Sequence, residues 1–390
     1  IPAGAYEAKV AHGLSWDENY GVGGAPNGAN YAFSVAGDDL VVFRYTLETN
    51  TLEIAVENPP LAGLGTEQAI WAASGAIAWP VGLLGGVPAA NASWTLEHSA
   101  DATLELVDGE VVGGGEPVTL ERLTDGLPTE VREKFPHLAG SVALAPQSLE
   151  RADVAALVRG QLWVVQRVDG EITAVTGVQI PGVLDDLYAA GAADAELGAV
   201  VDGSSVTLNL WAPTARAVSA EVWSAGATGD ATVISASFDD ASGVWSVDDE
   251  SIEVGSEYRW LVEVFAPSTG DIETNSVTDP YSTALTVNSA RTVVVDLDAD
   301  ELRPQLWEDT PAPTVERSVD RAIYELHVRD FSIGDETVPA EERGTYRAFT
   351  RDSAGTQQLR QLAEAGITTV HLLPTFDIAT IEEVRSEQAV

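Results

Sequence analysis

The clearest hydrophobic pattern of the chain lies near its carboxyl end. Two short runs rich in β-branched and other apolar residues, Ala322–Phe331 and Gly366–Ile381, have the composition of buried strands. Between them, apolar residues recur at helical spacing within Ser353–Ala365. Asp352 or Ser353 can cap the start of this helix, and the glycine that opens the second run can end it. We therefore predict a βαβ unit with parallel strands, which opens a larger parallel sheet or barrel.

Most of the chain ahead of this unit consists of short β-rich runs separated by Gly, Asn, Asp and Pro. This punctuation is typical of β-sandwiches, and the length suits two or three modules. Gln161–Arg167 alternates as a strand, and Asp169 with Gly170 predicts a hairpin turn after it. Val206–Val218 and Tyr258–Val264 alternate in the same way. The predicted fold is mostly β, with tandem β-sandwich modules ahead of the βαβ unit.

Charge limits the classes of partner. The chain has 61 Asp and Glu against 20 Lys and Arg, which gives a formal net charge of −41. Nucleic-acid backbones and anionic membranes would repel such a chain, so neutral or cationic partners remain. The hydrophobic content of 45% is ample for folded cores, so the acidity does not signal disorder. No run is long and apolar enough for a membrane helix, and we expect a monomer with neither nucleic-acid binding nor membrane insertion.

The residue types give no support to disulfide or metal chemistry. The absence of cysteine excludes a disulfide framework and a thiolate metal site. None of the five histidines falls at metal-ligand spacing from another, so we expect no metal site and no evident cofactor in the chain. The histidines are His12, His98, His137, His327 and His371.

Three phrases follow one another in and around the βαβ unit. They are Tyr-Glu-Leu-His-Val-Arg-Asp-Phe-Ser (324–332), Gly-Thr-Tyr-Arg-Ala-Phe-Thr (344–350) and His-Leu-Leu-Pro-Thr-Phe-Asp-Ile-Ala-Thr (371–380). Their order and spacing resemble the first two strands of the (β/α)8 catalytic barrel in glycoside hydrolase family 13, most closely its pullulanase branch. A βαβ unit of another α/β fold would not need these particular residues. The resemblance implies a truncated barrel, because a complete one takes about 250 residues.

The resemblance also implies where an active site would form. Active-site residues of such barrels lie at the carboxyl ends of the strands. Scaffold roles compete with this interpretation, because Asp330 and Asp377 can cap loops or pair with arginines, and histidines within a strand are usually satisfied core residues. The candidate barrel-mouth or family-motif residues are Tyr324, His327, Arg329, Asp330, His371, Pro374, Phe376 and Asp377.

Retaining hydrolysis of an α-1,6-glucosidic branch needs two carboxylates about 5 to 5.5 Å apart, one as nucleophile and one as general acid/base. The family takes them from barrel strands four and five, with a further Asp after strand seven, and all three would lie beyond Val390. We therefore expect no catalytic residue in this chain, and an inactive chain. The resemblance implies that the complete protein is a secreted enzyme acting on pullulan, starch, glycogen or limit dextrins, with calcium left open as its cofactor. The alternative is a stand-alone α-glucan-binding protein with several modules and no hydrolase activity.

Phrases in the earlier modules extend the resemblance toward the amino end. Ile1–Val10 and Ser15–Gly21 are similar to the small starch-associated β-module of some pullulanases and amylases, without its first strands and without a signal peptide. Leu157–Leu162 and Thr176–Tyr188 resemble the all-β second domain of pullulanases. Val206–Val218 resembles carbohydrate-binding module family 48, an immunoglobulin-like sandwich. The implied domains are 1–60, starch-associated module with its start missing; 61–192, second all-β domain; 193–303, family 48-like sandwich; 304–320, linker; and 321–390, the first two barrel strands.

Two aromatic residues of the first module are candidate glucan contacts. Trp16 and Tyr20 can stack on a sugar ring, since an aromatic face against the C–H side of the ring is the usual basis of neutral glycan recognition. A core tryptophan with a satisfied N–H is the slightly favoured alternative for Trp16, because Asp17–Asn19 suits a structural loop. In the third module, Trp211 alternates with its strand neighbours and is expected in the core rather than as a sugar platform.

Overall fold

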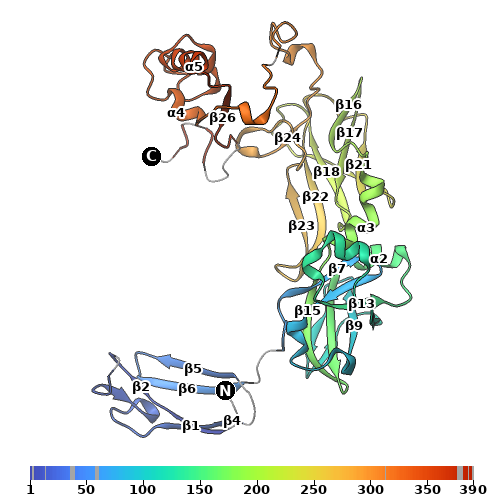
Figure 1. The fold of residues 1–390 in the computed structure, drawn as a ribbon, viewed down its shortest axis with the longest axis vertical. Coiled ribbons are helices and arrows are strands. Elements are labelled where there is room, and N and C mark those ends of the chain that lie inside the picture. The colour runs from blue at the N-terminus through green and yellow to red at the C-terminus, as the bar shows by residue number, and fades with distance from the viewer. Residues whose placement is uncertain are drawn as a thin grey trace.

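The computed structural model describes residues 1, 4–13, 15–35, 40–57, 61–311, 313–375, 381–384 and 386–388. Three β-rich units and a smaller α/β unit follow one another along the chain (Figure 1). The prediction of a mostly β fold is confirmed. Within the described residues, no helix has the length and apolar character needed to cross a membrane.

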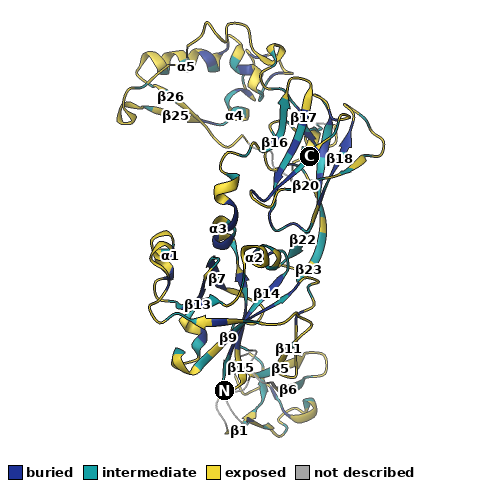
Figure 2. Cartoon of the chain, turned by 90° about the vertical axis from the view of Figure 1, so that its right-hand side faces the viewer, coloured by how far each residue is buried: buried dark blue, intermediate teal, exposed yellow. Residues whose placement is uncertain are grey.

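Short antiparallel strand pairs build the amino-terminal unit. Its elements are β1 (Gly4–Ala8), β2 (Val10–Ala11), β3 (Asn19–Tyr20), η1 (Val22–Gly24), β4 (Tyr31–Val35), β5 (Leu40–Thr46) and β6 (Thr51–Glu57). The β1–β4 pair contacts the β5–β6 hairpin through aromatic rings. The ring of Phe33 stacks on Tyr6 with 5.6 Å between centroids and meets Phe43 edge-on at 5.8 Å. Few residues of this unit are buried, in contrast to the two units that follow (Figure 2).

A closed seven-stranded barrel forms the second unit. Its strands are β7 (Glu67–Ala73), β8 (Ala76–Trp79), β9 (Ala92–Ser99), β12 (Val118–Arg122), β13 (Val142–Pro146), β14 (Gln161–Val168) and β15 (Glu171–Gln179). Around the ring their order is β12-β13-β8-β7-β15-β14-β9, and β15 closes it by pairing in parallel with β7. The sandwich predicted for this module is therefore wrong. Closure joins the first and last strands of the unit, and alternation along single strands cannot reveal such a distant pairing.

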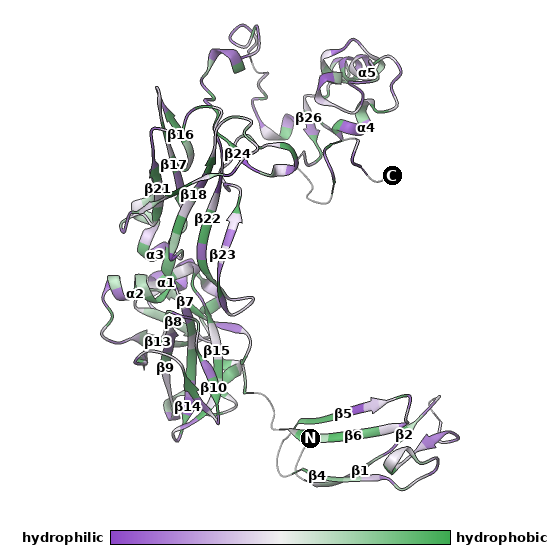
Figure 3. Cartoon of the chain, turned by 180° about the vertical axis from the view of Figure 1, so that it is seen from behind, coloured by the Kyte–Doolittle hydropathy of each residue, from purple (hydrophilic) through white to green (hydrophobic). Residues whose placement is uncertain are grey.

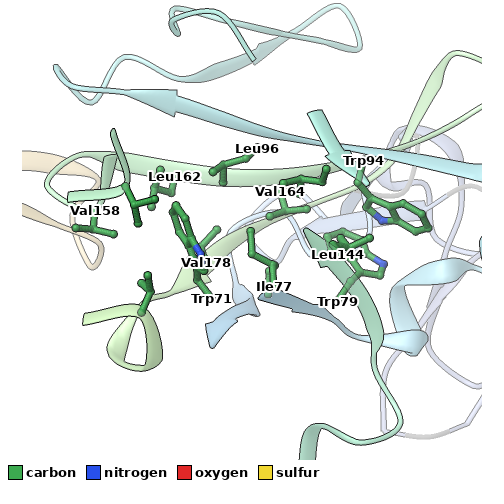
Figure 4. Packing of buried hydrophobic residues seen from close by; sticks show 14 of the residues in the cluster. Trp71, Ile77, Trp79, Trp94, Leu96, Leu144, Val158, Leu162, Val164 and Val178 are labelled. Atoms are coloured by element: carbon green, nitrogen blue, oxygen red, sulfur yellow. The ribbon is translucent and has the colours of Figure 1, made fainter. Parts of the chain in front are cut away.

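Large apolar side chains fill the barrel. Trp71, Trp79 and Leu96 are completely buried, and the ring of Trp94 meets that of Trp79 edge-on at 6.4 Å (Figure 4). The predicted hairpin turn between β14 and β15 is confirmed, because Asp169 and its glycine neighbour have the positive φ angles, 52° and 92°, that a two-residue hairpin turn needs. The remaining elements of this unit are η2 (Val81–Leu84), η3 (Ala89–Asn91), β10 (Glu105–Val107), β11 (Glu110–Val112), α1 (Thr129–Lys134), η4 (Pro136–Leu138), α2 (Arg151–Leu157) and α3 (Pro181–Ala192).

The third unit is a sandwich of two antiparallel sheets, as predicted. Its strands are β16 (Gly198–Asp202), β17 (Ser205–Trp211), β18 (Ala217–Trp223), β19 (Thr232–Ser235), β20 (Ser237–Phe238), β21 (Val244–Asp248), β22 (Glu257–Ala266), β23 (Asp271–Val277) and β24 (Thr292–Val293). One sheet has the order β16-β17-β21-β20, and the other has the order β19-β18-β22-β23 with β24 beside β22. The strand β23 is largely hydrophilic beside its hydrophobic neighbour β22 (Figure 3). Polar residues on an edge strand discourage pairing with a second chain.

Trp211 packs against a hydrophobic core, as predicted, but this core belongs to the barrel and not to its own sandwich. Leu208 and Leu210 point into the sandwich core, so the next residue along β17 lies on the opposite face. There Trp211 is half-buried, packs against the barrel's core cluster and donates its Nε1–H to the carbonyl of Ser242 at 2.9 Å. It therefore belongs to the junction between barrel and sandwich.

The predicted βαβ unit is confirmed in the last unit. β25 (Ile323–Leu326) and β26 (Thr369–Leu372) pair in parallel, and α5 (Ala354–Glu364) lies between them in sequence. The side chain of Ser353 accepts the backbone N–H of Thr356 at the start of the helix, and the side chain of Thr356 accepts the backbone N–H of Ser353. Gly366, with a φ of 106°, follows the end of the helix. The first strand is shorter than predicted, because its last predicted residues form α4 (Val328–Ser332). The 3-10 turn η5 (Val287–Ser289) lies between β23 and β24, and η6 (Asp300–Leu302), η7 (Ser318–Asp320) and η8 (Tyr346–Thr350) follow the sandwich.

We expect the amide protons of β25 and β26 to exchange much faster than those of β8. All four side chains of β8 are buried, whereas Ile323 is 58% exposed and Val370 is 46% exposed. Two strands and one helix bury too little apolar surface to resist local opening, so a difference of about 3 kcal/mol in opening free energy is expected. Hydrogen exchange followed by mass spectrometry measures it. Equal protection in β8 and β25 would contradict the prediction.

Candidate functional site

Three of the predicted barrel-mouth or family-motif residues line a hollow of about 440 Å³ between β25 and α5. Tyr324, His327 and Asp330 line it. His327 follows β25 as the N-cap of α4, where its Nδ1 accepts the backbone N–H of Asp330 at 3.4 Å. The placement of this histidine within the strand is therefore wrong. The local cap ends the strand, which a reading of apolar runs does not detect.

The second predicted histidine pairs the two strands. His371 lies within β26 directly opposite Glu325, and its Nδ1 is 3.0 Å from a carboxylate oxygen of that residue. Both side chains are more than half exposed, so His371 is not the buried core histidine that was the usual expectation for its position. Arg329 on α4 and Pro374 after β26 are exposed. Phe376 and Asp377 lie outside the described residues.

Several other motif residues have scaffold roles. The ring of Phe331 stacks on Phe349 with 4.1 Å between centroids, and it lies so close to Gly355 that a Cβ there would be 2.8 Å from the ring. Arg351 donates two hydrogen bonds to the buried Glu342, and this lowers the pKa of that carboxyl below its ordinary value. These contacts stabilise the loop between α4 and α5.

The chemistry available at this strand end is limited. Glu325 is engaged with His371, and Asp330 lies 3.7 Å from the His327 ring nitrogen. Among the described residues, no group of three or more His, Asp or Glu side chains could hold a metal ion. Of the predicted residues, His327 caps α4 and His371 pairs with Glu325 across the two strands, and contact of any of them with a substrate stays a prediction.

The structure separates the two candidate glucan contacts of the first unit. Trp16 is 68% exposed, so the interpretation as a core tryptophan is wrong. Its carbonyl accepts the side-chain N–H of Asn19 at 2.8 Å, which fixes the backbone of the loop that carries it. Tyr20 is half-buried in β3, and its hydroxyl donates to Glu18 at 2.8 Å. The indole of Trp16 is therefore more accessible to a ligand than the ring of Tyr20.

A polar cluster beside these residues was missed by the sequence interpretation. His12 bonds Glu18 through Nδ1 at 2.9 Å and the hydroxyl of Tyr45 through Nε2 at 2.8 Å. Hydrogen bonds from Tyr20 and His12 lower the pKa of Glu18, and the same carboxylate raises the pKa of Tyr20. The residues come from separate strands and a loop, so no sequence spacing could have indicated their association. This cluster holds Tyr20 in place.

Three family models match successive parts of the chain. A pullulanase X25 domain matches residues 1–52, a pullulanase N2 domain matches 66–186, and a carbohydrate-binding module 48 (isoamylase N-terminal domain) matches 196–282. The N2 match covers the closed barrel, and the module 48 match covers most of the sandwich.

Whole-chain comparisons agree with these matches. The chain is 38% identical to the chloroplastic pullulanase 1 of Arabidopsis thaliana over 81% of its length and 32% of that protein, and 34% identical to the pullulanase of Klebsiella pneumoniae over 84% of its length and 29% of that protein. The crystal structure of Klebsiella pneumoniae pullulanase complexed with maltotriose is similar with a TM-score of 0.74 and 33% identity, covering 83% of this chain and 30% of that one. The crystal structure of PulA from Klebsiella oxytoca has a TM-score of 0.77 at 26% identity, covering 100% of this chain and 40% of that one.

The chain thus spans about a third of the length of these curated relatives. Over the matched residues it consists of pullulanase X25 and N2 domains and a carbohydrate-binding module 48, and it is homologous to the amino-terminal part of pullulanases, which are glycoside hydrolases.

Proposed function

We propose that the complete protein is a secreted pullulanase that hydrolyses α-1,6-glucosidic branches of pullulan, starch, glycogen or limit dextrins by a retaining route. The order of the X25, N2 and module 48 matches, followed by a parallel β25–β26 pair, carries this proposal. Within it, the 390-residue chain engages glucan and the chemistry is performed by carboxylates outside the chain. A signal peptide encoded ahead of Ile1 would support secretion, and retention of the product in the cytoplasm would contradict it.

The first unit supplies the proposed glucan contact. Trp16 offers an exposed indole, and a neutral sugar can stack its C–H face on such a ring without opposing the chain's net charge of −41. Pullulan and starch are uncharged glucans, so both can stack on the indole of Trp16 in this way.

We expect the purified chain to be retarded in a gel that contains soluble starch or pullulan, and to release no reducing sugar from pullulan. Trp16→Ala should weaken the retardation by roughly tenfold in apparent affinity, because one aromatic stacking contact is lost. Leu47→Ala, which removes an apolar side chain of the same unit that is 70% exposed, is the matched control. Retardation unchanged by Trp16→Ala would contradict the assigned contact.

The competing function, a stand-alone glucan-binding protein, predicts the same retardation. The reading frame of the source gene distinguishes the two. A continuous frame whose product hydrolyses pullulan, with NMR detecting first-formed sugar in the α-configuration, would support the retaining enzyme. Hydrolysis by the 390-residue chain itself would contradict the location of the chemistry, and a full-length product without hydrolysis would favour the binding protein.

A further inference from the structure

A groove separates one end of the barrel from the β22–β23 hairpin of the sandwich. Two hollows of about 400 and 250 Å³ adjoin there and share Glu67, Leu162, Phe265 and Pro267 as lining residues. The barrel wall comes from the starts of β7 and β14 and the end of β15, and the opposite wall is the tip of the hairpin. Sites for small ligands have volumes of about 300–1,000 Å³, so the groove has room for several sugar rings.

Contacts between the two units hold the groove at a defined width. The guanidinium of Arg159, from the barrel, lies 4.2 Å from the ring centre of Phe238 in the sandwich, and its Nε donates to the carbonyl of Pro213 at 3.2 Å. From the sandwich side, Arg216 donates to the carbonyl of Ala100 and lies 3.5 Å from the carboxylate of Asp101. These hydrogen bonds and cation–π contacts, made by arginines of both the barrel and the sandwich, resist movement of the two units relative to each other.

Two half-buried aromatic residues contribute to the lining of the groove. Trp163 stands on the outer side of β14 directly opposite Gly177 of β15, and Phe265 comes from the end of β22. A Cβ at Gly177 would lie 3.0 Å from Cγ of Glu67, so the side chain of Glu67 packs closely over this glycine, which is paired with Trp163. Trp163 and Glu67 therefore border the same part of the groove.

The polar groups of the groove suit hydroxyl groups as ligands. Glu67 is exposed, and its carboxylate has no hydrogen bond or ion pair with any described residue. Ser268 and Thr269 of the hairpin tip add hydroxyls to the same lining. A carboxylate accepts hydrogen bonds from adjacent sugar hydroxyls, whereas an anionic ligand would be repelled by it and by the net charge of −41.

We propose that this groove is a second oligosaccharide-binding site, which takes a short α-glucan segment between Trp163, Phe265 and Glu67. The identity of the glucan rests on the proposed function, whereas the class of ligand, a neutral oligosaccharide, follows from the rings, the carboxylate and the charge. The site belongs to two units at once, so neither the barrel nor the sandwich forms it alone.

The test uses the full chain labelled with 5-fluorotryptophan, whose ten tryptophan signals are observed by fluorine NMR during titration with maltohexaose. Trp163→Phe and Trp16→Phe assign the two relevant signals. We expect a saturable shift of the Trp163 signal, and Glu67→Ala should weaken its midpoint by about tenfold, since hydrogen bonds to a charged group are lost. Glu121→Ala is the matched control, because Glu121 is also exposed on the barrel but does not line the groove.

The outcomes separate this inference from the proposed function. A shift of the Trp16 signal without one of Trp163 would overturn the groove and leave glucan binding by the first unit intact. A Trp163 shift without one of Trp16 would support the groove and overturn the contact assigned to the first unit. An equal Trp163 response to cellohexaose would overturn the α-glucan identity, and no shift of either signal would overturn both sites.

Discussion

Replacing Trp71 with alanine is expected to unfold the barrel at a much lower urea concentration than in the unchanged chain. The side chain is completely buried in the barrel core, and its Nε1–H points to the carbonyl of Ser74 at 3.4 Å. Truncation of a buried tryptophan removes apolar burial and leaves a cavity, which together cost about 3–5 kcal/mol. Because this is a large part of the stability of an ordinary domain, we expect the barrel to lose its near-UV circular dichroism first.

The chain provides a control of the same chemical change. Trp16→Ala removes an identical side chain from a position that is 68% exposed, and we expect it to leave the urea midpoint of the barrel unchanged. Equal midpoints for the two variants would contradict the assignment of Trp71 to the core. Hydrogen exchange in β8, a strand of the barrel that pairs with β7, locates the effect in this unit.

Asp279→Ala is expected to destabilise the sandwich strongly. The carboxylate is 2% exposed and accepts the hydroxyl of Tyr258 at 2.6 Å, the indole N–H of Trp260 at 2.9 Å and the backbone N–H of Tyr281 at 2.7 Å. Each buried donor left without its acceptor costs about 1–3 kcal/mol, and the Tyr258 and Trp260 side chains would both lose theirs. Urea unfolding with hydrogen exchange in β22 measures the loss.

Two further variants make this prediction specific. Asp279→Asn keeps the shape and one carbonyl acceptor, so we expect an intermediate loss of stability. Asp202→Ala removes an exposed carboxylate from the same unit and should change little. Unfolding of Asp279→Ala at the same urea concentration as Asp202→Ala would show that the buried contacts contribute nothing.

The same contacts predict a dependence on alkaline pH. Burial, and then the nearby Asp279 carboxylate, raise the pKa of Tyr258 above its ordinary value. A pKa that is higher in the folded state gives stability that is complete below the unfolded value of about 10 and is lost as the pH rises beyond it. In the unchanged chain, ionisation of Tyr258 should therefore accompany unfolding of the sandwich, as tyrosinate absorbance and circular dichroism followed together would detect.

Local patterns predicted local structure well. The cap at Ser353, the glycine after α5 and the turn at Asp169 and Gly170 were all recognisable, because each depends on a few adjacent residues. The parallel pairing of β25 with β26 was also predictable, since a helix between two apolar strands has few other ways to bury them. The end of β25 was not, because the side chain of His327 captures a backbone N–H three residues later.

Amino-acid sequence alone determined the mostly β fold, the βαβ unit and the resemblance to pullulanases. The net charge of −41 argued against anionic partners, and the lack of cysteine excluded disulfides and thiolate metal sites. Only the tertiary structure decided that the second unit is a closed barrel, that Trp16 is exposed and that Trp211 lies at a junction. It alone brought Trp163, Glu67 and Phe265 to one groove. The reason is physical: caps, turns and alternation are set by neighbours in the chain, whereas ring closure, exposure and shared grooves depend on which distant surfaces bury each other.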